Sequence, residues 1–557
     1  MSLLVICSGS GYATDYFFHA SQGTDTNTGT TISSPWQSLA QLSEITLKAG
    51  DRVLLAEGEH FRGNISLFDV NGTEQMPVII TSYRVSNEPK AKPIIDAKGL
   101  EAGIAVVDSR NIEISDIQIM ADGGTIKRSV ELAQRLKERK FKSMRVGILV
   151  LSIRRGVYHG IRIDNVEVKD VFANNAGTTR SYAETSSANG TEEYGFGIYT
   201  ISYDGTELHD VSITNSVIRD ISHTGIKFKG KKSIVNALVK RNKIRDSGGP
   251  GIQMSGVVKS VVSYNVVNRP GSNKDGRNWA RGSGMWTWGS DSIIVEQNQF
   301  LNANGPGDSA GFHIDFNCKN IIVQYNLSVN NAGGFIEILG NNYNNTYRYN
   351  VSVNDGHRIK QKGVAFQEGK TLWLSGFVGG GRKGKTTRPR KRHGPYNTYI
   401  YNNTIYVKDE ITARIAVTRV AEGAFIANNI FHIMGDSAMV KGDQYAPESD
   451  SDAINLKNVV FTNNLFLKQT NWPRQVLIQD QAPLFGNAEF TRPGGIELTD
   501  YIPQNVELIA DKGIAIALIP GDRDGLIVAL DAQTDILGNP FVGKPDLGAI
   551  EINFSEK

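Results

Sequence analysis

The chain has 557 residues, and its 60 lysines and arginines nearly balance its 57 aspartates and glutamates, which leaves a formal net charge of +3. This balance excludes a general nucleic-acid binder, since such proteins carry a marked excess of basic residues. No segment of the sequence approaches the roughly 18 consecutive apolar residues of a membrane-spanning helix. The 58 glycines and the 21% of charged residues are typical of a globular protein rich in strands and turns.

The N-terminus reads MSLLVICSGSGYATDYFF. Its apolar run from Leu3 to Cys7, followed by small residues, resembles the remainder of a secretory leader that lacks a basic end. We therefore expect residues 1–14 to precede a folded domain that spans 15–557, and the protein to be secreted or periplasmic. Its two cysteines cannot make a disulfide framework, and Cys318 is expected to be buried as a small apolar residue.

The segment 33–47, SSPWQSLAQLSEITL, predicts a short amphipathic helix. Ser34 supplies an N-cap, Pro35 fits the first helical position, and the apolar residues that follow form a stripe along one face. We expect this helix to belong to an N-terminal cap over about residues 15–60, because an uncovered sheet end exposes unpaired strand edges.

An asparagine recurs along the chain within short strand-like runs such as SIIVEQNQF and NIIVQYNLSV. The series is Asn165, Asn215, Asn242, Asn265, Asn298, Asn326, Asn350, Asn403, Asn429 and Asn464. Successive gaps are 50, 27, 23, 33, 28, 24, 53, 26 and 35 residues, which indicates a base period near 25 with long insertions or missed copies.

Stacked strand-turn units of this length are typical of a parallel β-helix, in which each coil pairs its backbone with the next. The recurring asparagine then has a structural role: it occupies a turn, tolerates a left-handed backbone and bonds to its counterpart on the neighbouring coil. The sequence therefore predicts an all-β fold made of a single parallel β-helix.

Several parts of the chain resemble one superfamily. The opening YFFHASQGTDTNTGTTISSPWQSLAQL, the segment LKAGDRVLLAEGEHFRG, the YN and NN repeats and the final PDLGAIE look like secreted right-handed β-helix proteins of the pectate-lyase-like superfamily. The resemblance covers nearly the whole chain and implies a right-handed β-helix, with PDLGAIE near a C-terminal cap. That superfamily includes many polysaccharide lyases and glycoside hydrolases, so the resemblance implies a carbohydrate-active enzyme without choosing its reaction.

Glycines align the strands of five successive coils, GIYTI, GIKFK, GIQMS, GMWTW and GFHID, which begin at residues 197, 225, 251, 284 and 311. Period-two geometry sends the residue after each glycine inward and the next one outward. The predicted inward residues are Ile198, Ile226, Ile252, Met285 and Phe312, with Ile314 and Phe316 in the last coil. The predicted outward rows are Tyr199, Lys227, Gln253, Trp286 and His313, and beside them Lys229, Ser255, Trp288 and Asp315. In the following coil, GGFIEIL, Glu337 points outward if Ile336 and Ile338 face the core.

Two tryptophans on an outer face, next to His, Asp, Glu, Gln and Lys, indicate a carbohydrate groove. Indole rings stack on the apolar faces of sugars while the polar groups meet hydroxyls or acidic substituents. The alternative is that a loop covers these aromatic rings. The residues predicted to bind substrate are Tyr199, Lys227, Lys229, Gln253, Trp286, Trp288, Arg281, Glu193 and Glu368.

Four long insertions surround the same coils, at 121–146, 174–195, 268–283 and 371–397. Long loops on a rigid scaffold commonly carry the functional site. The first insertion contains SVELAQRLKERKFK, a predicted basic helix that is either a solvated face or part of the site. The last contains seven Lys or Arg between residues 382 and 392, either for solubility or to close over a polyanionic chain.

Hydrolysis of a glycosidic bond needs a protonated carboxyl and a second carboxylate about 5–9.5 Å apart. Asp315 and Glu337, one coil apart on one face, fit this need, and His313 could tune the pKa of Asp315 or hold a water. The sequence thus predicts a glycoside hydrolase for an anionic polysaccharide, with these three residues catalytic. Some β-helix hydrolases, the iota-carrageenases among them, carry carboxylate-x-carboxylate on one strand, whereas here the first position is His313. The partner of Asp315 therefore stays open among Glu337 and the lesser candidates Glu192, Glu193, Asp308 and Glu368.

Two alternatives remain from the sequence. A polysaccharide lyase would use cationic and phenolic groups as base, acid and neutraliser of a uronate, for which Lys227, Lys229, Tyr199, His313 and Arg281 are available. Ca²⁺ is possible in that case, but no acidic cluster has calcium-loop spacing, so no metal site is predicted and no cofactor is required. A non-catalytic polysaccharide-binding β-helix is the second alternative. In each case we expect a monomer whose partner is a polysaccharide, with neither nucleic acid nor a membrane span.

Overall fold

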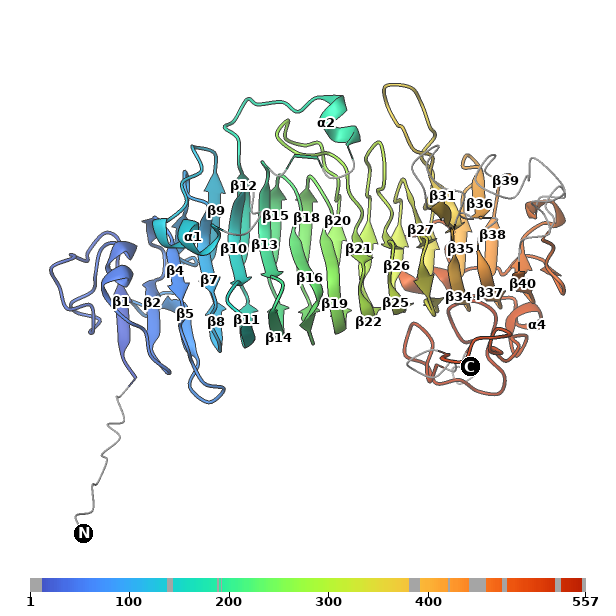
Figure 1. Cartoon of the computed structure of the whole chain (residues 1–557). Helices are drawn as coiled ribbons and strands as arrows, with labels where there is room; N and C mark the ends of the chain where they lie inside the picture. Colours follow the sequence, from blue (N-terminus) through green and yellow to red (C-terminus); the bar gives the residue numbers. More distant parts are fainter. Residues whose placement is uncertain are drawn as a thin grey trace, which may run out of the picture.

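The structure, a computed structural model, describes residues 13–137, 144–187, 190–191, 193–379, 391–418, 421–439, 457–472, 478–525 and 532–552. Short strands pair in parallel from coil to coil, and Figure 1 shows them side by side along the molecule from β2 at the blue end to β40 at the orange end. A 26-stranded sheet covers two faces of the solenoid and a 14-stranded sheet covers the third. The predicted all-β parallel β-helix is confirmed.

The strands fall on three faces, which we call the first, second and third face in the order that the chain visits them within a coil. The first face contains β4 (Ile65–Phe68), β7 (Ala102–Val107), β10 (Arg145–Ser152), β13 (Gly195–Ser202), β21 (Met285–Trp288), β24 (Phe312–Ile314), β27 (Gly334–Ile338), β31 (Lys370–Leu374), β36 (Ala413–Val417) and β39 (Ser437–Met439). β16 (Ile226–Val235) and β19 (Ile252–Ser263) run from the first face into the second.

The second face contains β1 (Asp15–Phe18), β2 (Arg52–Ala56), β5 (Val78–Tyr83), β8 (Ile112–Ser115), β11 (Gly156–Asp164), β14 (Thr206–Thr214), β17 (Leu238–Lys240), β22 (Asp291–Glu296), β25 (Lys319–Gln324), β28 (Asn342–Tyr343), β29 (Thr346–Arg348), β34 (Pro395–Tyr401), β37 (Glu422–Ala427) and β40 (Lys457–Thr462).

The third face contains β3 (His60–Arg62), β6 (Ile94–Asp96), β9 (Gln118–Asp122), β12 (Glu167–Phe172), β15 (Val217–Ile221), β18 (Lys243–Ser247), β20 (Val266–Asn268), β23 (Gln299–Leu301), β26 (Leu327–Val329), β30 (Val351–Val353), β35 (Thr404–Val407), β38 (Ile430–Ile433), β41 (Leu465–Phe466) and β42 (Leu484–Phe485). A separate antiparallel hairpin is formed by β32 (Phe377–Gly379) and β33 (Lys391–His393).

The helices are short: α1 (Val130–Arg135), α2 (Tyr182–Ser186) and α4 (Val506–Ile509), with 3-10 helices η1 (Leu39–Glu44), η2 (Gln469–Asn471) and η3 (Leu498–Tyr501). The predicted amphipathic helix of the N-terminal segment is η1, and it begins four residues later than expected, after Ser38, which makes no side-chain capping bond. Only Leu39 of η1 is buried, and it packs with Trp36 and Leu47 in the main core cluster.

The inward residues predicted from the glycine alignment form the core. Ile198, Ile226, Ile252, Met285, Phe312 and Ile314 are all 0% exposed and belong to one cluster that runs the length of the solenoid. Ile336 and Ile338 join them, as the outward placement of Glu337 requires. The prediction for Phe316 is wrong: its ring is half-buried and lies against Phe377 outside the coil. The strand β24 ends at Ile314, so the alternation no longer applies there.

The recurring asparagine forms a buried ladder from Asn242 to Asn464. At each step the backbone N–H and the side-chain Nδ2 of one asparagine donate to Oδ1 of the asparagine on the next coil, for example from Asn265 to Asn298 at 2.9 Å each. The left-handed backbone belongs to the residue before it, as in Tyr264 with φ 57°. Asn165 and Asn215 are themselves such left-handed residues, with φ 49° and 51°, so the ladder begins only at the third member of the sequence series, Asn242.

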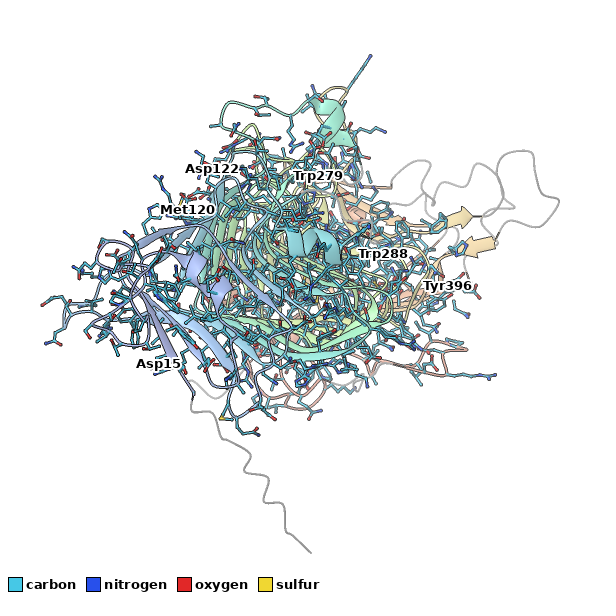
Figure 2. All side chains as sticks on the ribbon, turned by 60° about the vertical axis from the view of Figure 1, so that its left-hand side comes forward. Asp15, Met120, Asp122, Trp279, Trp288 and Tyr396 are labelled. Carbon is cyan, nitrogen blue, oxygen red and sulfur yellow. The ribbon has the colours of Figure 1, made fainter. Side chains whose placement is uncertain are left out.

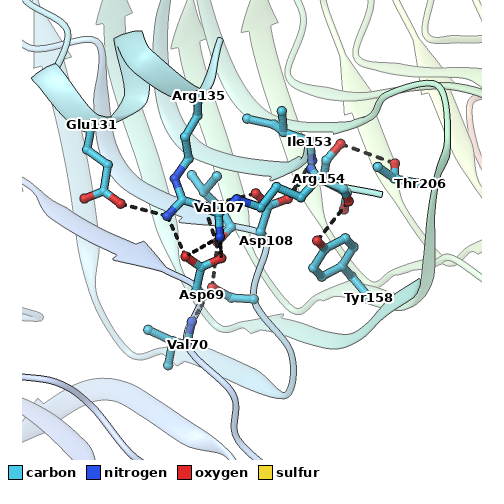
Figure 3. Close-up of polar contacts among 12 residues, drawn as sticks. Asp69, Val70, Val107, Asp108, Glu131, Arg135, Ile153, Arg154, Tyr158 and Thr206 are labelled. Carbon is cyan, nitrogen blue, oxygen red and sulfur yellow. Dashed lines mark hydrogen bonds and ion pairs between the residues drawn. The ribbon is translucent and has the colours of Figure 1, made fainter. Parts of the chain in front are cut away.

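The insertion at 121–146 packs onto the coils through α1. Arg135, whose side chain is 9% exposed, donates to the carboxylates of Asp69, Asp108 and Glu131 (Figure 3). Its guanidinium also lies 5.0 Å from the centre of the Phe68 ring. Arg135 therefore anchors α1 to the coils, which is a structural role.

The C-terminal segment packs along the side of the solenoid, in red at the lower right of Figure 1. Within the PDLGAIE motif, the Gly548 N–H donates to the Asn428 carbonyl and the Ala549 N–H to Thr404 Oγ1. The motif therefore covers the outer corner between the second and third faces rather than the open end of the last coil.

The ladder gives a stability prediction. In Asn298→Ala, the Asn265 N–H loses its acceptor, while Asn265 Nδ2 keeps its bonds to the Val239 and Ser263 carbonyls. The bonds that Asn298 Nδ2 donates to Val262 and Asn326 are lost as well. A buried group left unsatisfied costs about 1–3 kcal/mol. We expect the free energy of unfolding, measured by urea denaturation, to fall by about 2–4 kcal/mol. The exposed Asn273→Ala is the control; an equal loss in both variants would contradict a special role for the ladder.

Candidate active site

The strand register builds the outward rows predicted on the first face. One row contains Tyr199, Lys227, Gln253, Trp286 and His313 in coil order. The second contains Lys229, Ser255 and Trp288. Asp315 extends the second row, because its N–H donates to the carbonyl of Thr287, the residue before Trp288. Side chains from five coils therefore converge on one outer surface.

Glu337 occupies the first row. Its neighbour Ile338 pairs with Ile314, and Glu337 itself pairs with Trp373 on the following coil. The register therefore sets Glu337 next to His313 and diagonal to Asp315.

Asp308 enters the same site from the loop 302–310, which leads into β24. Its two carboxylate oxygens accept hydrogen bonds from Nε and Nη2 of Arg281, each at 3.0 Å. The Arg281 side chain is 10% exposed, whereas Asp308 is 31% exposed and open to a ligand. The charge of Asp308 affects the pKa values of Asp315, Glu337 and His313, which shows that it lies close to all three.

The backbone around Asp308 is strained and tightly held. Asp308 and Ser309 have φ values of 48° and 62°, and each such residue costs about 1–3 kcal/mol. Arg358 donates to the Asp308 carbonyl at 2.9 Å, and the Asp308 N–H donates to Oε1 of Gln367 at 2.8 Å. These two hydrogen bonds hold the backbone of Asp308 in place and so fix the direction of its side chain.

Asp315 is a carboxyl group that retains its proton near neutral pH. Burial raises its pKa from 3.8 to about 7, the Phe316 N–H that donates to Oδ1 at 2.8 Å opposes the shift, and the charge of Asp308 adds to it. Asp315 and Asp308 thus form a pair in which one carboxyl holds a proton and the other is ion-paired with an arginine.

Glu337 is the third carboxyl of the site. Its side chain is 8% exposed, and burial raises its pKa from 4.5 to about 8, although the nearby Lys370 charge opposes the shift. The Lys370 ammonium also lies 3.8 Å from the centre of the Trp373 ring. Glu337 is therefore enclosed beneath its neighbours, in contrast to Asp308.

His313 is neutral at neutral pH, since burial lowers its pKa to about 4. Its ring stacks on Trp286, with centres 6.0 Å apart and planes 5° apart, and Nδ1 shares a hydrogen bond with Ser283 Oγ at 3.1 Å. The sequence predicts that His313 tunes the pKa of Asp315 or holds a water, but His313 is not among the groups that shift the pKa of Asp315. The residue instead forms a rigid aromatic wall with Trp286.

The other predicted binding residues divide into two groups. Gln253 and Trp286 line the surface next to His313, and Trp288 is 42% exposed in the row of Asp315. Lys229 is also exposed in that row. Tyr199, by contrast, is 2% exposed in a cluster with residues of the loops above it, which places it below any groove.

The remaining residues predicted to bind substrate either lie away from Asp308 and Asp315 or already bind other side chains. The Lys227 ammonium stands over the rings of Phe196 and Tyr199, at 4.8 and 5.0 Å from their centres. Glu368 is ion-paired with Arg414 at 2.8 Å. Glu193 is exposed, and its carbonyl accepts a hydrogen bond from Arg180. Arg281 lies in the site, but it binds Asp308. Glu192 lies outside the described residues.

Asp308 matters more than the sequence suggested. The segment GPGDSAGF is typical of a turn-rich loop. The one sequence feature that could have indicated a role for Asp308 is its position seven residues before Asp315, just ahead of the same strand. The sequence did not predict that Arg358 and Lys370 lie near the site, because both residues follow the coil of Glu337 in the chain and belong to no repeated pattern. No group of three or more His, Cys, Asp or Glu side chains with metal-binding geometry occurs within the described ranges. None of the helices in these ranges could span a membrane.

Comparisons with known proteins support this architecture. A family model described as a right handed beta helix region matches residues 197–376, the coils that carry the site. The lacto-N-biosidase of Bifidobacterium longum subsp. longum is 23% identical over 643 residues, which cover 97% of this chain and 36% of that protein. The chain thus spans about a third of the length of this curated relative.

Solved structures agree on the fold. The crystal structure of the GH136 lacto-N-biosidase from Eubacterium ramulus has a TM-score of 0.56 and 19% identity, covering 76% of this chain and 68% of that one. The complex of XylC with xylose has a TM-score of 0.50 and 11% identity, covering 97% of this chain and 98% of that one. The chain is a right-handed parallel β-helix. The resemblance to β-helix proteins is therefore confirmed.

The proton on Asp315 leads to a pH prediction. Its pKa is about 7 in the folded state and about 3.9 in an unfolded chain. Because the folded state holds this proton more tightly, proton binding by Asp315 stabilises the fold. The stabilisation is fully present below about pH 4 and is lost as the pH rises to about 7, since the unfolded chain gives up the proton first. In Asp315→Asn this loss disappears. We expect the stability difference between variant and wild type, from urea unfolding, to shift in favour of the variant by more than about 1 kcal/mol between pH 4 and 7. A difference that does not change with pH would contradict the raised pKa.

Proposed function

We propose that the protein is a glycoside hydrolase whose catalytic pair is Asp315 and Asp308. The observation that carries this proposal is the pairing of a carboxyl that holds its proton to about pH 7 with a partly exposed carboxylate that is ion-paired with Arg281. Glycosidic hydrolysis needs such a proton donor and a second, ionised carboxylate.

The relatives favour the same reaction. Similarity to the lacto-N-biosidase of B. longum extends over nearly the whole chain, and the E. ramulus lacto-N-biosidase has the same fold. We therefore propose an activity of the lacto-N-biosidase kind, on oligosaccharides or polysaccharides that present a lacto-N-biose unit.

In this mechanism Asp315 protonates the leaving oxygen, and Asp308 acts as the second carboxylate at the anomeric carbon or on its attacking water. Arg281 orients the Asp308 carboxylate through two hydrogen bonds. Glu337 has a raised pKa like Asp315, so it does not supply the ionised partner. Its position beside His313 fits a role in shaping the site, so this proposal departs from the pairing of Asp315 with Glu337 that the sequence predicts.

The sugar-binding surface is proposed from Trp286, Trp288 and Gln253. Aromatic faces bind the apolar sides of sugar rings, and an amide can bond to hydroxyls. An anionic substrate is the finer part of the proposal. It is supported by the exposed Lys229 two coils from Trp288, whereas most of the basic stretch 382–392 lies outside the described residues. Sulfated and unsulfated forms of one glycan would test this part.

Replacement of the two aspartates tests the proposal. We expect Asp308→Asn and Asp315→Asn each to lower kcat by about 10³-fold or more, because each removes one half of the acid and carboxylate pair. Glu337→Gln, the matched carboxyl-to-amide control, should retain far more activity. The assay would use a panel of glycans that present a lacto-N-biose unit, because an aryl leaving group that needs little protonation would mask the loss of the acid in Asp315→Asn. Circular dichroism would confirm folding. Full activity in either aspartate variant would refute the assignment.

The same assay separates hydrolysis from elimination. Hydrolysis gives a new reducing end without ultraviolet absorbance, whereas a lyase leaves an unsaturated, absorbing end. The described geometry offers little to a lyase, since Tyr199 is buried and Lys227 stands over aromatic rings. A purely binding protein would show neither product.

The pH profile gives an independent test. Since Asp315 must be protonated to act as the acid, kcat/KM should fall tenfold per pH unit above a pKa of about 7. With p-nitrophenyl lacto-N-bioside, whose leaving group needs little protonation, the fall should be shallower. A profile that is flat from pH 6 to 9 with both substrates would contradict the role of Asp315.

A further inference from the structure

The two proposed catalytic carboxyls give the site a direction, and the inference that follows rests on the proposed function. Asp308 precedes β24 and lies on the side where the chain arrives from the third face. Asp315 follows β24 and lies at the corner between the first and second faces. An acid donates its proton to the leaving oxygen, so the leaving part of the substrate must lie on the Asp315 side of the bond.

The Asp308 side is closed by packed loops. Arg281 donates to the carbonyls of Ser186 and Ser187, and its guanidinium lies 4.9 Å from the centre of the Phe366 ring. The Phe366 ring packs closely against Gly307, since a Cβ at that position would lie only 2.0 Å from the ring. The corner beside Asp315 lies at the other end of β24 from these contacts.

Aromatic rings in contact with one another lie at that corner. Phe316, the residue after Asp315, contacts Phe377 edge to face with ring centres 5.5 Å apart. Phe377 is 42% exposed and stacks on His393 at 4.8 Å, with planes 18° apart. The hairpin of β32 and β33 therefore holds two flat rings against the turn that follows Asp315.

A second stacked pair continues around the corner. Tyr343, 40% exposed, stacks on Tyr396 with ring centres 4.8 Å apart and planes 17° apart. Backbone hydrogen bonds connect the turns of successive coils at this corner. The Asn317 N–H donates to the Gly340 carbonyl, and the Asn341 N–H donates to the Gly394 carbonyl. Figure 2 shows Tyr396 and Trp288 on one flank of the molecule, away from Trp279 and Asp122.

Polar groups border these rings. Asn341 Nδ2 donates to Asn317 Oδ1 at 2.6 Å, and the Tyr343 hydroxyl lies 3.4 Å from Asn341 Oδ1. Flat rings beside exposed amides and a hydroxyl are the combination that binds a sugar, through the apolar face and the hydroxyl edge together. An apolar contact surface for another protein would lack this alternation along the turn.

We propose that Phe377, His393, Tyr343 and Tyr396 form a binding strip for the sugars on the leaving-group side of the scissile bond. The substrate then crosses the solenoid from the third-face loops to the second face instead of lying along its axis. The strip sets a preference for substrates with two or more sugars beyond the bond, and it contributes nothing to a substrate that has only a small aryl leaving group.

The test compares two substrates with the same glycone, p-nitrophenyl lacto-N-bioside and the tetrasaccharide in which lacto-N-biose is joined to lactose. For Tyr343→Ala and Phe377→Ala we expect kcat/KM on the tetrasaccharide to fall about tenfold, with the aryl glycoside changed less than twofold. Tyr264→Ala, at an equally exposed tyrosine with 44% exposure outside this corner, is the control and should change neither.

Equal effects on both substrates, or no effect on either, would overturn the strip while the proposed hydrolysis stands. If wild-type protein cleaves neither substrate, the proposed function fails, and the strip is judged by calorimetry with the uncleaved tetrasaccharide. A Kd about tenfold weaker in Tyr343→Ala than in Tyr264→Ala supports the strip in that case, and no difference, or no binding, overturns it.

Discussion

The ion pair between Arg281 and Asp308 is the interaction on which the proposed site depends. Arg281 donates to both carboxylate oxygens at 3.0 Å, and this bidentate contact fixes the direction in which Asp308 presents its negative charge. Burial raises the pKa of Asp315 to about 7, and the charge of Asp308 adds to this shift. Without the arginine, the Asp308 side chain would lose the two hydrogen bonds that orient it.

The scaffold makes such an arrangement possible because its register is fixed over many coils. The asparagine ladder bonds each turn to the next through both backbone and side chain, so a strand cannot slip by one residue without breaking it. Residues far apart in sequence, such as Arg281 and Arg358, can therefore hold one strained loop from two sides. The rigidity of the coils thus keeps the left-handed backbone at Asp308 in place.

The repeat and the alternation in the sequence were sufficient to predict the coils, the inward residues of five strands and the outward position of Asp315. They were sufficient because both depend on local period and on stacking of like with like. The half-buried position of Phe316 and the proposed pairing of Asp315 with Asp308 were not predictable in that way. The strand ends at Ile314, and Asp308 reaches the site through loop contacts with Arg281, Arg358 and Gln367 that no periodic pattern encodes. Tyr199 points outward as expected, yet the same insertions that frame the site cover it.

The difference between the two flanks of the site connects the electrostatics with the path of the substrate. On the Asp308 flank, arginines, strained backbone and the Phe366 ring fill the space, as an ionised carboxylate in a defined position requires. On the Asp315 flank, aromatic rings lie beside the acid, and no cation of the described residues is among the groups that shift its pKa. The apolar surroundings that bury Asp315 raise its pKa, and the aromatic rings among them suit the faces of departing sugars. One local property therefore serves both proton donation and binding of the leaving group.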